Sequence, residues 1–141
     1  MVFRTNARRA GLPANELAAG PGQESKEMEA TDPMQFLGMP VKVVVDRALG
    51  STHPRYDWSY PVNYGHVPGT RSADGAELDA YVLAVGTSCA SFEGTCIAVV
   101  LRSNDDDPKL IVVPRGVTLS DEEIRIQIHF QEKFFQSRVV R

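Results

Sequence analysis

The sequence predicts a mainly β protein, namely a small β-barrel with one C-terminal helix packed against it. Short apolar runs with many β-branched residues recur between residues 41 and 113, which is typical of strands. Clusters of Gly, Ser, Asn, Asp and Pro separate these runs, and no long helical segment lies between them, so a parallel sheet with crossover helices is disfavoured. The 141 residues suit a single domain with a modest core.

Four strands are predicted from these runs. They cover, in chain order, residues 41–45, 79–85, 95–101 and 109–113. The run at 97–101 is apolar at consecutive positions, so both faces of that strand should be buried. We therefore expect a helix or a loop to cover the outer side of the barrel.

The helix is predicted from residue 120 onward by its capping residues. Ser120 and Glu123 form a capping box, in which the hydroxyl accepts a backbone N–H and the glutamate reaches back to the helix start. The acidic run at 121–123 also complements the positive end of the helix dipole. Apolar side chains then recur at helical spacing, and we expect them to pack on the barrel as core: Ile124, Ile126, Ile128, Phe130, Phe134 and Phe135.

The first part of the chain differs in composition from the rest. Residues 1–33 are rich in Ala, Gly, Pro, Glu and Arg and show no sustained periodicity. Arg8 and Arg9 lie near the start, but no apolar segment follows them, so a secretion signal is disfavoured. We expect residues 1–38 to form a disordered extension and residues 39–141 to form the barrel domain.

Charge and cysteine content argue against several classes of partner. The formal net charge is −3, so binding to a nucleic-acid backbone has no electrostatic support, and no apolar run is long enough to span a membrane. Cys89 and Cys96 have neither metal-site nor disulfide-framework spacing, which is typical of reduced intracellular proteins. We therefore expect a cytoplasmic protein without nucleic-acid or membrane partners. The oligomeric state stays open, and a homo-oligomer is one option.

The stretch from residue 60 to residue 83 carries the strongest functional signal. Tyr60 precedes an Asn-Tyr-Gly turn that contains Tyr64, and Asp74 and Asp79 follow, five residues apart, directly before an apolar run. Both carboxylates lie where a loop enters a predicted strand, so they can converge on one cation, and hard divalent cations such as Mg²⁺ take oxygen ligands. The tyrosine hydroxyls can donate hydrogen bonds to an anion at the same place. These residue types indicate a site for phosphate and metal.

A second acidic segment, Asn-Asp-Asp-Asp-Pro-Lys, occupies residues 104–109. Alone, three consecutive aspartates indicate a solvated turn, because like charges repel one another. In an extended segment, however, Asp105, Asp107 and Lys109 would share one face, because side chains alternate along a strand. That face would present two acids and one base at the mouth of the barrel.

Both segments resemble the motifs of the soluble, Mg²⁺-dependent inorganic pyrophosphatases. Residues 60–65 match Y-P-x-N-Y-G, residues 74–79 match part of D-G-D-P-x-D, and residues 107–114 match D-x-K-(I/L)-x-x-V-P. The resemblance extends over residues 41–135, with a shortened start. It implies a distorted OB-like β-barrel, Mg²⁺ as the cofactor, and hydrolysis of inorganic pyrophosphate to two phosphates.

The resemblance also implies roles for individual residues. The implied metal ligands are Asp74, Asp79, Asp105 and Asp107. The implied catalytic residues are Asp74, Asp79, Tyr64 and Lys109. The implied substrate-binding residues are Arg55, Tyr64, Lys109 and Asp46. Asp46 stands in for an acid of the family's first strand, and His53 and Arg55 are candidates for the cationic function of its hairpin, whereas Trp58 and His66 are expected to be structural or peripheral.

Three positions depart from the family pattern and leave the function open. Ala76 stands where the family has the aspartate associated with water activation, so metals alone, Glu77 or Asp46 would take that role. Phe134 and Phe135 stand where the family has a Tyr-Lys pair that binds phosphate. A catalytically weak phosphate- or nucleotide-binding module, or a hydrolase of another phosphoanhydride, therefore stays an alternative to pyrophosphate hydrolysis.

Overall fold

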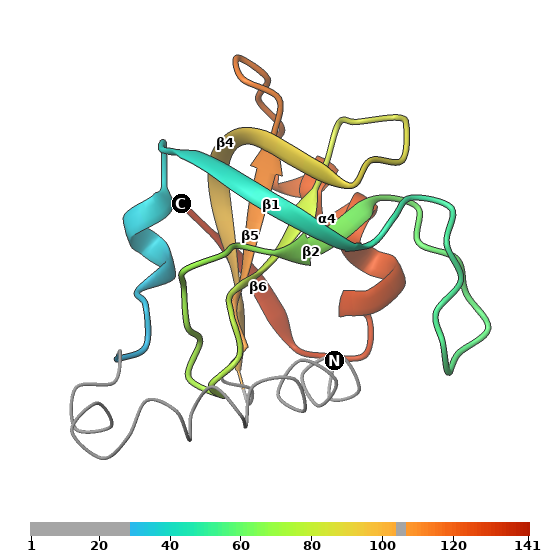
Figure 1. The fold of residues 1–141 in the computed structure, drawn as a ribbon, viewed down its shortest axis with the longest axis horizontal. Helices are drawn as coiled ribbons and strands as arrows, with labels where there is room; N and C mark the ends of the chain where they lie inside the picture. The colour runs from blue at the N-terminus through green and yellow to red at the C-terminus, as the bar shows by residue number, and fades with distance from the viewer. Residues whose placement is uncertain (1–28, 104–106) are drawn as a thin grey trace, which may run out of the picture.

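The structure is a computed structural model that describes residues 29–103 and 107–141, and it shows a β-barrel covered by one α-helix (Figure 1). In chain order the elements are η1, a 3₁₀-helix (Pro33–Phe36), β1 (Pro40–Arg47), β2 (Asn63–His66), β3 (Asp79–Val82), β4 (Ser91–Arg102), β5 (Lys109–Val113), α4 (Asp121–Glu132) and β6 (Ser137–Val140). The mainly β fold with a C-terminal helix that the sequence predicts is confirmed. No helix in the described ranges is long and apolar enough to cross a membrane.

Five strands close the barrel in the order β1-β2-β3-β5-β4, and the first half of β4 pairs back onto β1. The last four residues of β4 pair with β6, which lies outside the closed ring. β3 and β5 are parallel, whereas the other named pairs are antiparallel. β4 carries the chain from the end of β3 to the start of β5, so this parallel pair needs no crossover helix.

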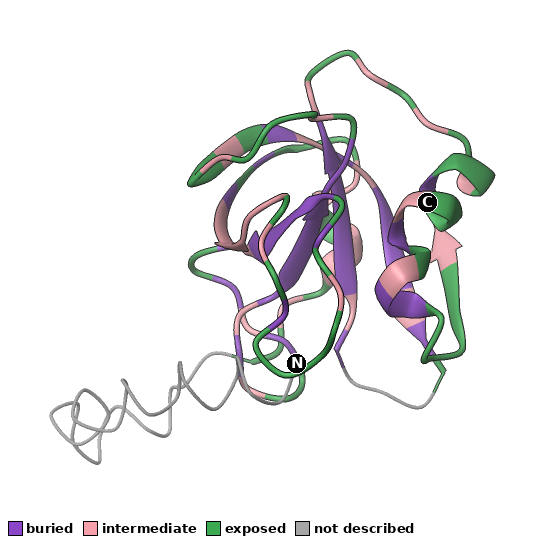
Figure 2. Ribbon diagram, turned by 90° about the vertical axis from the view of Figure 1, so that its right-hand side faces the viewer, coloured by how far each residue is buried: buried purple, intermediate pink, exposed green. Residues whose placement is uncertain are grey.

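Two hydrophobic clusters fill the space on the two sides of the sheet. On β5, Leu110 and Val112 belong to one cluster, while Ile111 and Val113 belong to the other, as the alternation of side chains along a strand requires. η1 covers the first cluster, which contains Leu110 and Val112, and α4 covers the second cluster, which contains Ile111 and Val113. Strands that are apolar on both faces are thus covered on their outer side, as the sequence predicts. Figure 2 shows the buried strands at the centre and exposed loops around them. Burying each such side chain contributes roughly 1.5–3 kcal/mol.

β2 is a strand that the apolar pattern does not predict. It has only four residues, Asn-Tyr-Gly-His, and lies between β1 and β3. Gly65 is required there, because a Cβ at this position would lie 1.9 Å from the carbonyl oxygen of Val44 on β1. Gly65→Ala would therefore push β1 away from β2. Close backbone approach, rather than strand propensity, determines this part of the barrel.

The helix differs in extent from the prediction. The capping box of Ser120 and Glu123 is present, but α4 ends at Glu132, and the chain turns there to enter β6. Phe134 and Phe135, predicted as core, lie beyond the helix and are 58% and 37% exposed. Ile126 is 68% exposed, because at about 100° per residue it faces away from the buried side of α4. The prediction of core packing was wrong for these three side chains.

The predicted domain boundary at residue 38 also needs correction. The backbone N–H of Thr31 donates to the carbonyl of Arg71 at 2.6 Å, and Asp32 caps η1 by accepting a hydrogen bond from the N–H of Met34. Met34, Phe36 and Leu37 pack against the first hydrophobic cluster. Residues 31–38 thus belong to the folded domain, because their apolar side chains cover the sheet. The predicted disorder of residues 1–28 lies outside the described residues.

Candidate functional site

The parallel pairing of β3 and β5 places Asp79 directly beside Lys109. The Lys109 ammonium donates to Asp79 Oδ2 at 2.8 Å and to Asp107 Oδ2 at 2.6 Å, and the Tyr64 hydroxyl donates to Asp79 Oδ2 at 3.0 Å. All four side chains are buried. We call Tyr64, Asp79, Asp107 and Lys109 the carboxylate–lysine cluster. These four residues are among those that the sequence predicts for the site, and the fold brings them together.

The charges in the carboxylate–lysine cluster do not balance, because one ammonium faces two carboxylates. Burial raises the pKa of Asp107, the charge of Lys109 counteracts this, and the neighbouring charges of Asp79 and Asp74 raise it further. Asp107 Oδ1 is buried and has no hydrogen-bond partner in the described part of the chain. A buried oxygen without a donor, in a cluster with excess negative charge, favours the binding of a cation.

The donor set fits Mg²⁺ in chemical type, since carboxylate oxygens are the ligands that hard divalent cations prefer. The expected convergence of three aspartates is not complete, however. Asp74 is exposed on the loop before β3, where its Oδ1 accepts from the Ser72 hydroxyl and, at 2.9 Å, from the backbone N–H of Ala76. Within residues 29–103 and 107–141, no three His, Cys, Asp or Glu side chains gather closely enough to hold a metal. Asp105 lies outside the described residues.

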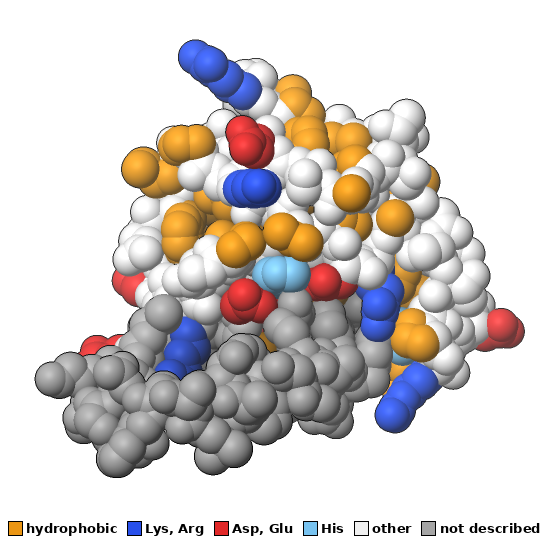
Figure 3. Space-filling view, in the orientation of Figure 1, with side chains coloured by type: hydrophobic (Ala, Val, Ile, Leu, Met, Phe, Trp, Pro, Cys, Tyr) orange, Lys and Arg blue, Asp and Glu red, His pale blue; other side chains and the backbone are white. Residues whose placement is uncertain are grey.

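A histidine that the sequence reading places at the periphery lies beside this cluster. His66 is opposite Asp79 in the pairing of β2 with β3, so the two side chains are on the same face of the sheet. His66 Nδ1 is 2.9 Å from Asp46 Oδ2, and its Nε2 is 3.7 Å from Glu77 Oε1. Figure 3 shows a histidine at the surface with acidic side chains on either side of it. The even spacing of Tyr64 and His66 along β2 was the sequence signal that would have found it.

Other residues of the Y-P-V-N-Y-G segment have structural roles. Asn63 Oδ1 accepts hydrogen bonds from the backbone N–H groups of Leu49 and Cys89, and its Nδ2 donates to the carbonyl of Thr87. One fully buried amide therefore holds two loops against β2. Tyr60 is also buried, and its hydroxyl donates to Gln131 at 3.4 Å. Of this segment, Tyr64 alone belongs to the carboxylate–lysine cluster.

The two candidates for a cationic function lie on the loop between β1 and β2. His53 Nδ1 accepts from the backbone N–H groups of Arg55 at 2.9 Å and Tyr56 at 3.2 Å, so the neutral ring carries its proton on Nε2. Burial lowers the pKa of His53, and the charges of Arg47 and Arg55 lower it further. A neutral His53 does not supply positive charge at neutral pH. Arg55 is exposed on this loop, and its contact with His53 is made by its backbone.

A second buried polar group joins the end of α4 to the barrel. Arg102 donates to both carboxylate oxygens of Glu132, at 3.0 and 2.6 Å, and the Tyr81 hydroxyl donates to Glu132 Oε2 at 2.5 Å. Gln131 Nε2 in turn donates to the Tyr81 hydroxyl at 2.7 Å. Burial alone would raise the pKa of Glu132, but the hydrogen bonds and charge of Arg102 outweigh this and lower it. We call Tyr81, Arg102, Gln131 and Glu132 the Glu132 network.

Comparison with known proteins identifies relatives of this chain. Residues 25–136 match the sequence model of a family described as inorganic pyrophosphatase. An inorganic pyrophosphatase of Sulfolobus acidocaldarius is 34% identical over 83 residues, which cover 54% of this chain. The same match covers 43% of the archaeal protein, so the similarity spans less than half of that relative's length.

Solved structures show the same fold. An inorganic pyrophosphatase of Ehrlichia chaffeensis superposes with a TM-score of 0.56 at 16% identity, covering 79% of this chain and 88% of its own. One from Coxiella burnetii gives a TM-score of 0.55, also at 16% identity and with the same coverage. One from Helicobacter pylori gives 0.52 at 20% identity, covering 81% of this chain and 86% of its own. At these identities the likeness shows the barrel fold and leaves the chemistry to be argued from the residues.

Proposed function

Because the chain belongs to the inorganic pyrophosphatase family, we propose that it hydrolyses inorganic pyrophosphate to two phosphates, with Mg²⁺ as the cofactor. The observation that carries the proposal is the carboxylate–lysine cluster, in which Lys109 lies between Asp79 and Asp107 and Tyr64 donates to Asp79. Such a cluster contains groups for both parts of a metal–pyrophosphate complex, since its carboxylates attract cations and its ammonium and hydroxyl attract phosphate oxygens.

Asp79 and Asp107 are the residues that would hold the metal, with Asp74 from the neighbouring loop. The charge of Asp74 already acts on Asp107, since it contributes to the raised pKa of that carboxyl. Asp105 stays a proposed fourth ligand outside the described residues. When bound, Mg²⁺ would supply positive charge that neutralises the pyrophosphate anion.

Lys109 and Tyr64 would position the anion. Lys109 is fully buried between two acids. Removing only the ammonium, or only the carboxylates, would leave a buried charge without its counter-ion and would lower the stability of the fold. A complex of cation and anion avoids that cost, because the carboxylates gain the cation while the ammonium gains phosphate oxygens. Donors fixed in a buried site stabilise the charge that develops as the bond to the leaving phosphate breaks.

Ala76 cannot accept the proton of the attacking water, so metals alone or a neighbouring acid would have to activate it. Asp46 and Glu77 are the acids that the sequence offers for this role, and both contact His66 beside Asp79. A positioned general base is worth about 10²–10⁴ in rate. Ala76→Asp should therefore raise phosphate release from pyrophosphate if the remaining geometry of the site is intact. No gain, with metal binding intact, would favour the alternative of a phosphate- or nucleotide-binding module.

Phosphate release from pyrophosphate tests the main proposal. We expect release with Mg²⁺ and none after chelation, and Lys109→Gln should reduce the rate by about 10²–10³, as expected for loss of one donor to the developing charge. Lys133→Gln is the matched control, because Lys133 is exposed at the end of α4. Circular dichroism of both variants separates loss of activity from loss of fold. Equal rates for Lys109→Gln and the wild-type protein would contradict the assigned role.

A cytoplasmic location without nucleic-acid or membrane partners stays part of the proposal. The free cysteines support a reducing compartment, since Cys89 and Cys96 are not joined in a disulfide. A homo-oligomer is proposed as one option for its assembly. Sedimentation of the purified chain tests the assembly, and cell fractionation tests the location.

A further inference from the structure

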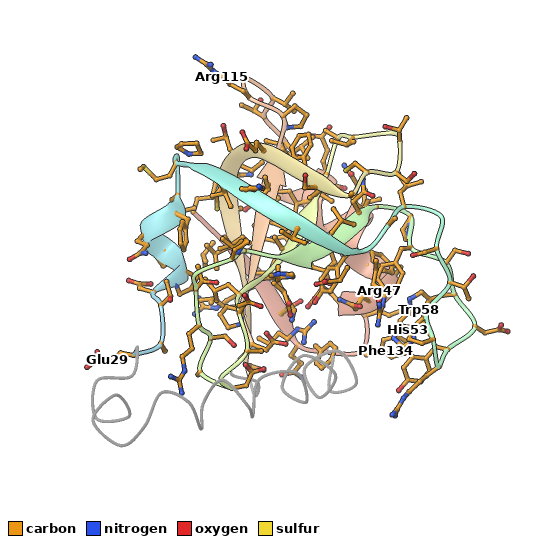
Figure 4. All side chains as sticks on the ribbon, viewed as in Figure 1. Glu29, Arg47, His53, Trp58, Arg115 and Phe134 are labelled. Carbon is orange, nitrogen blue, oxygen red and sulfur yellow. The ribbon has the colours of Figure 1, made fainter. Side chains whose placement is uncertain are left out.

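A cavity of about 320 Å³ lies between the β1–β2 loop and the segment that follows α4. Six residues line it: His53, Tyr56, Trp58, Gln131, Phe134 and Phe135. Figure 4 shows the side chains of His53, Trp58 and Phe134 gathered at this place, with Arg47 nearby. We call these six residues the ring pocket. Its volume is in the range of cavities that hold small organic ligands.

The rings of this pocket present flat apolar faces. Trp58 stacks on Tyr56 at a centroid distance of 5.0 Å and on Phe134 at 5.5 Å, with interplanar angles of 16° and 22°. Tyr56 and Phe134 are nevertheless 56% and 58% exposed. The Trp58 indole N–H is buried and finds no acceptor in the described ranges. Exposed parallel rings beside an unsatisfied donor match a planar ligand that carries hydrogen-bond acceptors.

The charge around the ring pocket selects among planar ligands. None of its six lining residues is acidic. The charges of Arg47 and Arg55 act on His53, where they add to burial in lowering its pKa. This positive surrounding disfavours a cationic ligand, such as a methylated ammonium group held by aromatic rings. It favours an uncharged ring that is joined to an anionic group.

A row of neighbouring rings connects the ring pocket with the carboxylate–lysine cluster. The His53 ring lies parallel to the Tyr60 ring at 6.1 Å, and the Tyr60 ring lies 6.0 Å from the Tyr64 ring. Tyr64 in turn donates to Asp79, and Gln131, which lines the pocket, accepts from the Tyr60 hydroxyl. Two successive centroid distances, 6.1 Å from His53 to Tyr60 and 6.0 Å from Tyr60 to Tyr64, therefore lead from the pocket to the cluster. This separation is comparable with the length of a ribose and its phosphates.

We propose that the ring pocket binds the base of a nucleoside diphosphate, so that the phosphoanhydride of this substrate lies at the carboxylate–lysine cluster. The inference rests on the proposed hydrolysis, and it names a substrate class for that site. Phe134 and Phe135 stand where the resemblance implies phosphate-binding side chains, and here they contribute rings to the pocket instead. Bases stack on such rings whatever their hydrogen-bonding edges.

The proposed step adds one water molecule across the phosphoanhydride. The water oxygen bonds to the terminal phosphorus, and the bond from that phosphorus to the bridging oxygen breaks. The nucleoside monophosphate leaves with the bridging oxygen, inorganic phosphate is released, and the proton lost by water passes to solvent. No oxidant, reductant or second substrate is needed.

Tryptophan fluorescence gives a direct test, because Trp58 is the single tryptophan of the chain. Adenosine diphosphate and adenosine should change its fluorescence saturably, whereas inorganic pyrophosphate should not. Phe134→Ala should lower the ratio of kcat/KM for adenosine diphosphate to kcat/KM for pyrophosphate by about tenfold or more, since stacking on one ring contributes that much. Ile126→Ala, on the outer face of α4, should leave both activities unchanged.

The outcomes separate the pocket from the proposed hydrolysis. Pyrophosphate turnover without any response to adenosine or adenosine diphosphate would overturn the pocket and leave the hydrolysis standing. Saturable binding of the diphosphate, with no hydrolysis of either compound, would support the pocket and overturn the hydrolysis. Binding of the diphosphate without its hydrolysis, while pyrophosphate is hydrolysed, would overturn the substrate assignment. Failure of both nucleoside compounds to bind, with a dimer that Phe134→Ala dissociates, would assign the rings to self-association instead.

Discussion

Among the residues that the structure describes, the barrel contains two buried groups of charged side chains, and they differ in how their charges are compensated. In the Glu132 network, one guanidinium meets one carboxylate, and both oxygens of that carboxylate accept hydrogen bonds from Arg102. In the carboxylate–lysine cluster, one ammonium meets two carboxylates, and Asp107 Oδ1 has no donor among the described residues. A compensated pair stabilises a fixed arrangement, whereas an uncompensated one gains by taking up a counter-ion. The first network therefore serves the fold, and the second is suited to bind a ligand.

The largest effect should come from breaking the compensated network. Arg102→Met would leave the Glu132 carboxylate buried without its cationic partner, and we expect the free energy of unfolding to fall by about 3–5 kcal/mol. Urea unfolding followed by circular dichroism measures this loss. As a control, Arg141→Met removes an ion pair with Asp121 whose side chains are 41% and 43% exposed, and it should cost below about 1 kcal/mol. Equal losses in the two variants would contradict the distinction.

In the uncompensated cluster, the effect of a mutation should depend on Mg²⁺. Millimolar Mg²⁺ should stabilise the wild-type protein, by about 2.7 kcal/mol when its concentration is 100 times Kd. Asp107→Asn should lose most of this gain, and at neutral pH the metal-free variant should be no less stable than the metal-free wild-type protein, because Asp79 still pairs with Lys109. Thermal unfolding with and without a chelator measures both quantities. Asp57→Asn, on the exposed loop, should keep the full gain, and an unchanged gain in Asp107→Asn would exclude it as a ligand.

The two carboxylates should respond to pH with opposite sign. The pKa of Glu132 is lowered from its usual 4.5, so its contribution to stability is present above pH 4.5 and is lost as the pH falls through the lowered value. The pKa of Asp107 is raised from its usual 3.8, so its contribution is present below pH 3.8 and is lost as the pH rises through the raised value. Each unit of difference between the folded and unfolded pKa is worth about 1.4 kcal/mol.

Denaturant unfolding in steps between about pH 3 and pH 7 checks these signs. The destabilisation caused by Glu132→Gln should shrink toward acid pH. Asp107→Asn should become more favourable, relative to the wild-type protein, as the pH rises toward neutrality. Parallel pH profiles for the two variants would show that their environments do not differ in the way described.

The smallest effect concerns the edge of the Glu132 network. The Arg102 guanidinium lies 3.6 Å from the centre of the Phe135 ring. Phe135→Leu keeps an apolar side chain but removes the ring, and it should lower the free energy of unfolding by about 0.5–1 kcal/mol. Phe135→Tyr is the matched control, since it keeps an aromatic ring beside Arg102. A loss in the control as large as in Phe135→Leu would remove the cation–π explanation.

The carboxylate–lysine cluster could be predicted from the sequence because its members lie in short motifs at strand ends. Asp79 and Lys109 each begin a strand. A site for metal and phosphate can be inferred from acids, a lysine and a tyrosine in these motifs without knowing the strand register. The Glu132 network could not be predicted, because Arg102 and Glu132 belong to no sequence motif and each is a residue type that usually lies at the surface. Their pairing depends on where the end of α4 meets β4.

Other differences arise where tertiary contacts decide local structure. β2 is determined by the close approach of Gly65 to β1 and by the hydrogen bonds of Asn63. Neither contact can be predicted from the sequence of a four-residue segment. The apolar spacing of α4 continues to Phe135, but the chain leaves the helix after Glu132 to pair with β4. Two predicted core rings therefore line a cavity at the surface.

The parallel pairing of β3 with β5 has a consequence for the order of folding. Asp79 and Lys109 are 30 residues apart, and all of β4 lies between them. Closing so long a segment costs chain entropy before the contacts between β3 and β5 can offset that cost, so this pairing should form late in folding. Contacts absent from the transition state affect the unfolding rate more than the folding rate. Substitutions at Asp79 or Lys109 should thus shorten the lifetime of the native barrel while leaving its rate of formation nearly unchanged.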